Sequence, residues 1–277
     1  MTVVTLASQT DWDGWRRAAR SLCARQIVPE AVHWQCDDAQ PGLFAGERDG
    51  CVDTRNGGLG AIRVPRSFLT LSRMVVCHRD TERFARLYRL LFRLQDEAGL
   101  LANATDPDVD WALKCGKAIR RDRHKMHAFV RFRKVGERDG RERFAAWFEP
   151  SHRIVELATP FFVRRFPNMD WAILTPDHSA IWQNGALRYA SGASRDDVPD
   201  ADRVEEQWKA YFAAIFNPAR LKVQAMTAEM PKKYWRNLPE AALIPELIAG
   251  AGQRTTAMRE SSVTEPSERS KRMARRR

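Results

Sequence analysis

Three side chains near the middle of the chain have the types that proton transfer or metal binding requires. His127, Glu149 and His152 supply two imidazoles and a carboxylate, groups that act as general acids and bases or as metal ligands. Glu149 and His152 flank Pro150-Ser151. The alternative is structural, with Ser151 capping a helix and His152 on the helix surface, and the shortness of the match favours it. The three residues are catalytic candidates only, and no metal site is assigned.

These residues can act together only if a hairpin brings them to one end of a sheet. The segments Met126–Lys134 and Glu142–Glu149 alternate in polarity around a glycine-bounded loop, which predicts a β-hairpin. In the expected register His127 lies opposite Glu149, beside Lys125. A His–Glu hydrogen bond that only stiffens the hairpin end would explain the same residues.

Basic and aromatic residues recur in the second half of the chain, a composition that suits a polyanion carrying flat bases. From Lys117 to Arg143 there are eleven Lys or Arg against four Asp or Glu, an excess of seven positive charges. The candidate nucleic-acid-binding residues are Lys125, His127, Arg131, Arg133, Arg220, Lys232, Lys233, Tyr234 and Trp235. Because alternate strand residues share a face, His127, Arg131 and Arg133 are expected to point the same way. A half-buried hairpin with a basic outer face is the equally weighted alternative.

Two other sets of polar residues have simpler interpretations. Four arginines recur in one helical segment, and we expect a solvated face or ion pairs with Asp80, Glu82 and Asp96. The four are Arg83, Arg86, Arg89 and Arg93. Asp177-His178-Ser179 has the residue types of a hydrolytic triad, but adjacent residues cannot form one, so a turn is predicted.

The elements that position these residues begin with a βαβ-like segment. The sequence predicts a strand at Thr2–Leu6, a helix from Trp12 to about Ala24 capped by Thr10 or Asp11, and a strand at Ala31–Gln35. Residues 37–60 are rich in Gly, Asp and Arg and indicate a long loop without a phosphate-binding fingerprint. Helices are then predicted over 65–77, 80–99 and 106–121.

The second half predicts an antiparallel sheet flanked by helices. A helix is expected from Ser151 to about Phe166, then strands at 169–174, 179–183 and 186–190 with a two-residue turn at Asn184-Gly185, then helices at 201–216, 218–229 and 239–251. The fold class is therefore α+β, with an N-terminal α/β part. We divide the chain at 1–118, 119–258 and 259–277, the last a disordered basic tail or linker. This division leaves open whether the first two parts share one core.

Composition narrows the classes of partner. The 277 residues carry a net charge of +11 and a pI near 9.8, which favours nucleic acid, an acidic protein or a membrane surface. The five cysteines include no CxxC pair, which argues against a zinc ribbon or an iron–sulfur cluster, and no cofactor is indicated. An odd cysteine count without a signal peptide predicts reduced thiols and a cytoplasmic protein. No apolar run is long enough to span a membrane.

Several collinear segments resemble a bacterial family of unknown function described as a probable DNA metabolism protein. The segments are His124–Phe132, Ala146–Pro150, Phe161–Phe166, Trp171–Pro176, Ile215–Arg220, Met230–Trp235, Asn237–Glu240 and Ile244-Pro245. The resemblance covers most of the chain to about Met258 and implies a DNA-repair context. Family members occur beside a radical-SAM protein assigned to DNA repair, and a similar domain precedes uracil-DNA glycosylase-like domains of the UdgX type. The resemblance implies a stand-alone form or the N-terminal part of such a fusion, and it brings no catalytic residues.

Three functional hypotheses follow. The first is a DNA-binding accessory protein in DNA repair or metabolism, acting with a uracil-DNA glycosylase-like or radical-SAM partner. The second is an enzyme that processes nucleic acid through a His/Glu acid–base or metal site. The third is a protein-interaction module whose basic surface docks an acidic partner. Salt-dependent DNA binding separates the first two from the third, and turnover on damaged DNA separates the first from the second.

Overall fold

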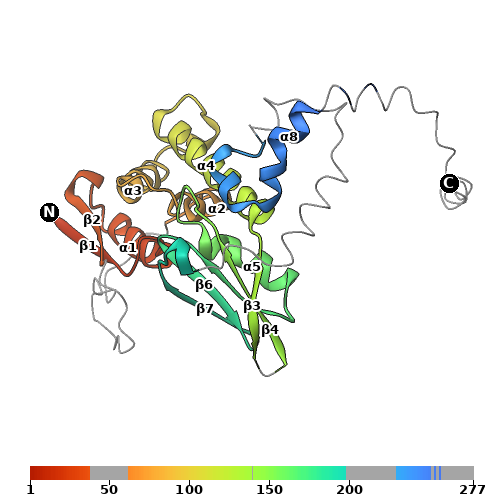
Figure 1. Ribbon diagram of the computed structural model, residues 1–277. Helices are drawn as coiled ribbons and strands as arrows, with labels where there is room; N and C mark the ends of the chain where they lie inside the picture. The colour runs from red at the N-terminus through yellow and green to blue at the C-terminus, as the bar shows by residue number, and fades with distance from the viewer. Residues whose placement is uncertain (38–61, 139, 198–228, 251–252, 254–255, 257–277) are drawn as a thin grey trace, which may run out of the picture. The chain divides into compact units, whose positions relative to one another are not determined.

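The computed structural model describes residues 1–37, 62–138, 140–197, 229–250, 253 and 256 (Figure 1). The chain forms two units, Met1–Pro199 and Asp200–Arg277. The loop predicted at 37–60, the helices predicted at 201–216 and 218–229, and the basic tail at 259–277 fall almost wholly outside the described residues.

The first unit opens with the predicted βαβ arrangement. Strand β1 (Thr2–Leu6) pairs in parallel with β2 (Val32–Cys36), and helix α1 (Trp12–Ala24) connects them through a short 3-10 turn, η1 (Pro29–Ala31). Asp11 caps α1, because its Oδ1 accepts a hydrogen bond of 2.8 Å from the Gly14 amide. These elements confirm the expectation for the N-terminal segment.

Helices α2, α3 and α4 pack around a large hydrophobic core of the first unit. They span Arg66–Val75, Arg83–Arg93 and Pro107–Phe129, with a 3-10 turn, η2 (Leu100–Ala102), before α4. Fully buried core side chains include Trp15, Phe68, Leu87 and Leu90. Gly116 allows α2 and α4 to approach closely, because a Cβ there would lie 2.7 Å from Leu71 Cδ1. The boundary expected at residue 118 falls inside α4.

Helix α4 is longer than the sequence analysis predicted, and this changes the hairpin. The segment 126–132 was expected to be a strand, but α4 continues to Phe129 and strand β3 begins only at Arg133. The buried residues Ile119, Asp122 and Met126 recur at helical spacing. The alternation of polarity from Met126 onward therefore fits the last turn of a helix, and the strand prediction for these residues was wrong.

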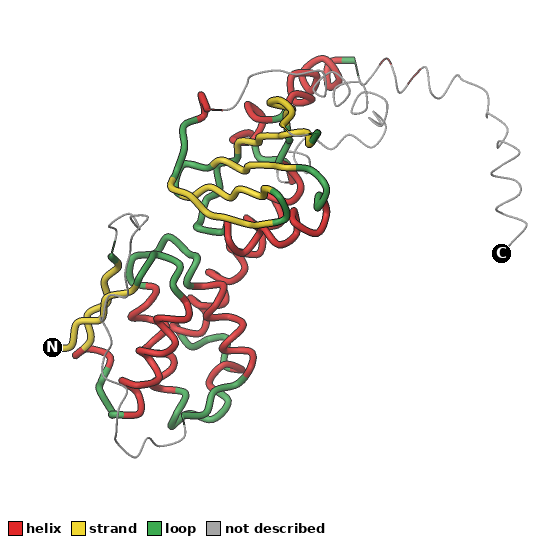
Figure 2. Tube along the Cα trace, turned by 90° about the horizontal axis from the view of Figure 1, so that it is seen from below, coloured by secondary structure: helices red, strands yellow, loops and turns green. Residues whose placement is uncertain are grey.

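The second half of the first unit contains a five-stranded sheet, whose strands are yellow in Figure 2. The strand order is β3-β4-β5-β6-β7. Its strands are β3 (Arg133–Arg138), β4 (Arg141–Trp147), β5 (Asp170–Leu174), β6 (His178–Gln183) and β7 (Ala186–Ser191). All neighbours are antiparallel except β4 and β5, which are parallel and connected through helix α5 (Val155–Arg165). Asn184 and Gly185 both adopt positive φ, which confirms the tight turn. The fold class is α+β.

Aromatic packing holds α5 against one face of this sheet. Phe162 of α5 contacts Trp171 of β5 with ring centroids 6.2 Å apart, and Phe132 contacts both rings. Ser151 was expected to cap α5, but the helix begins at Val155 and no side chain caps its first turn. The expected capping role of Ser151 was therefore wrong.

In the second unit the described residues form short elements. These are the 3-10 segments η5 (Lys232–Asn237) and η6 (Pro239–Leu243), followed by α8 (Ile244–Ala249). The helix predicted at 239–251 is thus a 3-10 turn that continues into a short α-helix. Within the described ranges, no helix combines the length and apolarity that crossing a membrane requires.

Candidate nucleic-acid interface

The C-terminal half of α4 carries several basic side chains on its exposed side. Lys117, Arg120, Arg121 and His124 are exposed, and Arg123 is partly exposed. Spacings of three, four and seven residues place 117, 120, 121 and 124 along one side of the helix. In the described part of the chain none of them forms an ion pair with a carboxylate, whereas Lys114 one turn earlier binds Asp110 at 2.7 Å.

The end of α5 adds to this positive charge. Arg164 and Arg165 are exposed in its last turn. The pKa of His127 is lowered, first by burial and then by the positive charges of Arg123, His124 and Arg164, which places these groups near one another. We call this region the α4–α5 basic surface. It consists of Lys117, Arg120, Arg121, Arg123, His124, Arg164 and Arg165.

His127 is half-buried and packs against α5. Its ring stacks on Phe161 at a centroid distance of 4.2 Å, and its Nε2 lies 3.1 Å from the carbonyl oxygen of Ala158. These contacts join the end of α4 to α5. The structure therefore gives His127 a packing role that the strand prediction did not anticipate.

The basic strand face expected from residues 127–133 is not formed. Lys125 and Arg133 are only 5% and 7% exposed. Arg131 Nη1 donates a hydrogen bond of 2.7 Å to the carbonyl oxygen of Ala128, which occupies one of the N–H donors of its guanidinium. The exposed basic residues nearest in sequence lie instead on α4, at Lys117, Arg120, Arg121 and His124, one to three turns before the predicted positions.

The three catalytic candidates contact different neighbours. The register that set His127 opposite Glu149 was wrong, because β3 pairs Arg133 with Ala145 and α4 holds His127. Glu149 Oε1 accepts a hydrogen bond of 2.8 Å from the Trp147 indole. The backbone amide of His152 donates to Asp122 at 2.9 Å, and the imidazole ring of His152 stacks on that of His78. Their catalytic role stays a prediction.

The structure brings together a different histidine and glutamate. His178 Nε2 of β6 lies 3.3 Å from Glu156 Oε1 of α5, an ion-pair distance if the imidazole is protonated. The His178 ring also stacks on Tyr189 of β7 at 5.3 Å. Asp177, predicted to be in a turn, precedes β6 and forms an ion pair with Arg79. No local sequence signal links these residues, because they come from separate elements.

The second unit contains the remaining candidate residues. Lys232 and Lys233 are exposed, while Tyr234 is buried. Trp235 is half-buried, and its indole donates to the carbonyl oxygen of Met230 at 2.9 Å. Arg220 lies outside the described residues. The lysines are thus accessible to an anion, whereas Tyr234 has no exposed ring face on which a base could stack.

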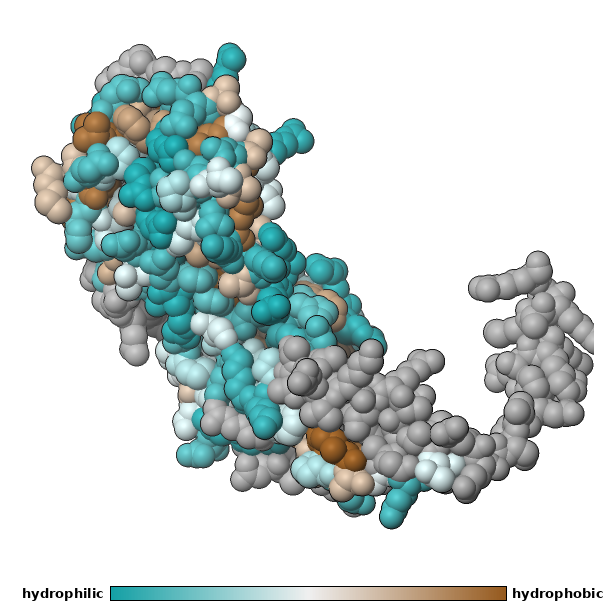
Figure 3. Space-filling model, turned by 90° about the horizontal axis from the view of Figure 1, so that it is seen from above, coloured by the Kyte–Doolittle hydropathy of each residue, from teal (hydrophilic) through white to brown (hydrophobic). Residues whose placement is uncertain are grey.

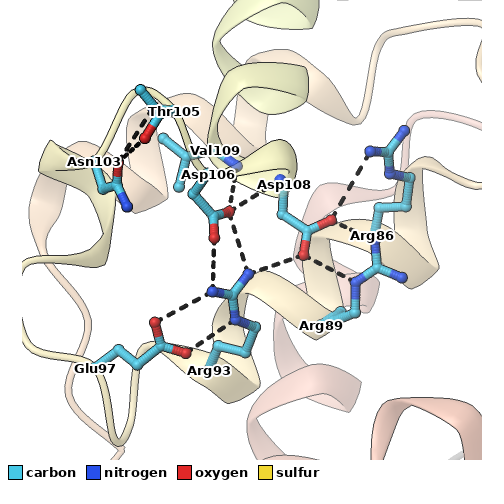
Figure 4. Close-up of polar contacts among 9 residues, drawn as sticks. All are labelled: Arg86, Arg89, Arg93, Glu97, Asn103, Thr105, Asp106, Asp108 and Val109. Carbon is cyan, nitrogen blue, oxygen red and sulfur yellow. Dashed lines mark hydrogen bonds and ion pairs between the residues drawn. The ribbon is translucent and has the colours of Figure 1, made fainter.

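The arginines of α3 are used differently from those of α4 (Figure 4). Asp108 receives ion pairs from Arg86 at 3.8 Å, from Arg93 at 3.1 Å and from Arg89. Arg93 also binds Asp106 at 2.7 Å and Glu97 at 3.0 Å. Ion pairing was expected, but the partners are Glu97, Asp106 and Asp108 and not Asp80, Glu82 or Asp96. Arg83, expected on a solvated face or in an ion pair, is instead buried.

The face of the molecule shown in Figure 3 is mostly hydrophilic, with small separate hydrophobic patches. Across the ranges that the structure describes, no three His, Cys, Asp or Glu side chains converge in a way that could hold a metal ion.

Comparison with known proteins gives a family and no further relative. No curated protein and no solved structure matches the chain. The sequence profile of one family, described as a domain of unknown function (DUF4130), matches residues 81–240. The match runs from the start of α3 into η6 and covers more than half of the 277 residues. The chain therefore belongs to the DUF4130 family.

Proposed function

We propose that this protein binds DNA as an accessory protein in DNA repair or metabolism. The observation that carries the proposal is the α4–α5 basic surface, whose cations have no carboxylate partner in the described part of the chain. A cation already paired within the protein gains little from a phosphate, whereas an unpaired one releases a condensed counterion when it binds.

The dimensions of the surface suit a nucleic-acid backbone. Lys117 and His124 are seven residues apart on α4, a rise of about 10 Å. One DNA strand advances by about 3.4 Å per phosphate along its axis, so this side of the helix matches roughly three steps. Arg164 and Arg165 extend the positive region from a second helix. Such contacts fix a protein on DNA without specifying a base sequence.

The resemblance to the probable DNA metabolism family supports the repair context. A protein that holds the backbone through helix cations could present damaged or uracil-containing DNA to a uracil-DNA glycosylase-like or radical-SAM partner. On this proposal, affinity for a duplex should change little when one thymine is replaced by uracil, because the partner reads the base. A large preference for the uracil duplex would assign lesion recognition to this chain.

The test is the salt dependence of DNA binding. For the variant Lys117→Gln/Arg121→Gln/Arg123→Gln/Arg164→Gln we expect the slope of log affinity against log salt to fall by about 3 to 4 relative to wild type. The control is Lys114→Gln, since Lys114 is 74% exposed but paired with Asp110. Fluorescence anisotropy with a short duplex measures both. Equal slopes for wild type and the fourfold variant, or no DNA binding at low salt, would contradict the proposal and favour the protein-interaction hypothesis.

A second candidate function is nucleic-acid processing, and the Glu156–His178 pair is the observation that favours it. A carboxylate beside an imidazole can orient the ring and stabilise its protonated form during proton transfer. Turnover of damaged or single-stranded DNA that is lost in His178→Gln, with unchanged unfolding and unchanged DNA affinity, would support this function. If the wild-type protein turns over neither damaged nor single-stranded DNA, this second candidate function is ruled out.

A further inference from the structure

Two connecting segments meet at a histidine- and arginine-rich junction in the first unit. One is Cys77–Asp80, between α2 and α3, and the other is Ser151–Arg153, before α5. The Arg153 amide donates to the Cys77 carbonyl at 2.9 Å, and Arg79 Nε donates to the Ser151 carbonyl at 2.8 Å. The rings of His78 and His152 stack with centroids 4.3 Å apart. Backbone and side-chain contacts therefore fix this junction.

Arg153 is a half-buried cation whose side chain lacks an anionic partner. Its Nη1 is buried from solvent and has no hydrogen-bond partner, and its guanidinium forms no ion pair, among the residues that the structure describes. A buried donor left without an acceptor costs about 1–3 kcal/mol, and more when it is charged. An anion that reaches this guanidinium would supply the missing acceptor.

A second cation nearby makes the excess of positive charge larger. Arg83 is 2% exposed, and its guanidinium donates to the neutral carbonyl oxygens of Val76, Asp80 and Gln9 at 2.7–3.0 Å. The pKa of Arg83 is lowered to about 10, first by burial and then by the positive charge of Arg153. The two guanidinium groups thus repel each other across a partly dehydrated region.

The nearby carboxylates are directed elsewhere. Asp80 accepts from the Glu82 amide through Oδ1 and from the Trp111 indole through Oδ2, both at 2.9 Å. Asp122, which is buried beside this junction, accepts a hydrogen bond of 2.9 Å from the His152 amide. Asp177 pairs with Arg79, and Glu156 lies 3.3 Å from His178. These acidic groups reduce the net charge of the region, but none of them forms an ion pair with Arg83 or Arg153 within the described ranges.

His78 supplies a neutral donor beside these cations. Its Nδ1 accepts a hydrogen bond of 3.1 Å from the Asp80 amide. In the neutral imidazole the proton is then on Nε2, which is a donor. The first turn of α5 begins two residues after Arg153 without a side-chain cap, so its amides add a partial positive charge. Arginine recognises phosphate through its planar guanidinium, and a neutral imidazole N–H and helix amides are donors that suit the same anion.

We propose that the junction of Cys77–Asp80 with Ser151–Arg153 binds a phosphate group, with Arg153 as the main cation and His78 as a neutral donor. The site shares no residue with the α4–α5 basic surface, and it does not depend on the proposed function. Phosphate from solution and the terminal phosphate of a nucleic acid have the same chemistry here, and the experiment separates them.

The first measurement is calorimetric titration with inorganic phosphate at constant ionic strength, with chloride as the reference anion. Wild type should bind phosphate, and Arg153→Gln should bind it roughly ten- to a hundredfold more weakly, as loss of one charge-assisted hydrogen bond implies. Arg164→Gln on the α4–α5 basic surface is the matched control and should bind phosphate like wild type. In phosphate-free buffer Arg153→Gln should melt at the wild-type temperature or higher, since it removes an unpaired charge.

Three results would overturn the site: no phosphate binding by wild type at millimolar concentration, equal binding by Arg153→Gln, or a lower melting temperature of that variant without phosphate. To identify the source of the bound phosphate, binding of a 5′-phosphorylated oligonucleotide is compared with binding of the same strand with a 5′-hydroxyl. Tighter binding of the phosphorylated strand that Arg153→Gln abolishes assigns the site to nucleic-acid ends. Equal binding of both strands, with inorganic phosphate still bound, assigns it to phosphate from solution. The salt slopes of the α4–α5 variants test the proposed function separately.

Discussion

In α3, Arg86, Arg89 and Arg93 each reach a carboxylate, whereas in the second half of α4, Arg121 and Arg123 reach none in the described part of the chain. Both sets are arginines on amphipathic helices, and both lie within the residues that match the family. The difference comes from what faces them. The start of α4 presents Asp106 and Asp108 toward α3, while the basic half of α4 lies beside the cationic end of α5.

Arginine therefore has two uses in this molecule, and sequence position alone does not distinguish them. The paired arginines of α3 bind carboxylates at the start of α4, and removing these charges from water costs part of the free energy that the pairing gains. Unpaired, exposed arginines add little to stability but create a potential that attracts a polyanion. The comparison predicts opposite effects of the same substitution on folding and on binding.

The largest expected effect is at Asp108, which is 7% exposed and accepts from three arginines. Asp108→Asn leaves these guanidinium groups without their counter-charge, so we expect a loss of about 3 kcal/mol in the free energy of unfolding. Denaturant unfolding measures it. Asp110→Asn is the control, because its partner Lys114 is exposed and the expected loss is below about 0.5 kcal/mol. Equal losses would mean that the buried network contributes no more than a surface pair.

A matched pair of arginine variants tests the division of roles. Arg121→Gln should weaken binding to a DNA duplex severalfold at low salt and lower the salt slope by about 1, with unfolding unchanged. Arg89→Gln should lower stability by about 1–2 kcal/mol and leave the slope unchanged. Fluorescence anisotropy gives the salt slope of each variant, and denaturant unfolding gives the free energy of unfolding of each. The comparison fails if both variants change the same quantity.

Acid should reveal the network at Asp108. Burial alone would raise its pKa, but the hydrogen bond and charge of Arg89, the hydrogen bond of Arg93 and the charge of Arg86 lower it overall. The stabilisation is therefore complete above the unfolded value of 3.8 and is lost as the pH falls through the lower folded pKa. The stability difference between wild type and Asp108→Asn should shrink as the pH falls from 5 to 2. A constant difference would rule out this linkage.

The smallest effect is expected on the pKa of His127, which the charges of the α4–α5 basic surface lower. Its pKa is lowered from 6.5 by burial and by nearby positive charge, so its neutral form stabilises the fold above pH 6.5 and this contribution declines as the pH falls through the folded pKa. Proton NMR titration should show the His127 pKa moving up toward 6.5 in Arg164→Gln. Arg195→Gln, outside the charges that act on His127, is the control. An unchanged pKa would separate Arg164 from this surface.

Much of the architecture could be predicted because it depends on local patterns. Trp15, Ala19 and Leu22 recur at helical spacing in the helix predicted from Trp12 to about Ala24, and all three are buried in α1. Asn184-Gly185 permits the positive φ values that the turn between β6 and β7 requires. The segment 126–132 could not be settled in this way, because its short polar alternation fits a strand and its neighbours fit a helix.

The site was less predictable than the fold, for a physical reason. The sequence alone determined the positive excess between Lys117 and Arg143, the α+β class and the set of side chains available for chemistry. Only the tertiary structure decided which cations find a carboxylate. Asp108 and Arg89 are 19 residues apart and Glu156 and His178 are 22 apart, and such pairs form only when separate elements pack. Arg153 is left without a carboxylate for the same reason, since the elements around it direct their acidic groups elsewhere.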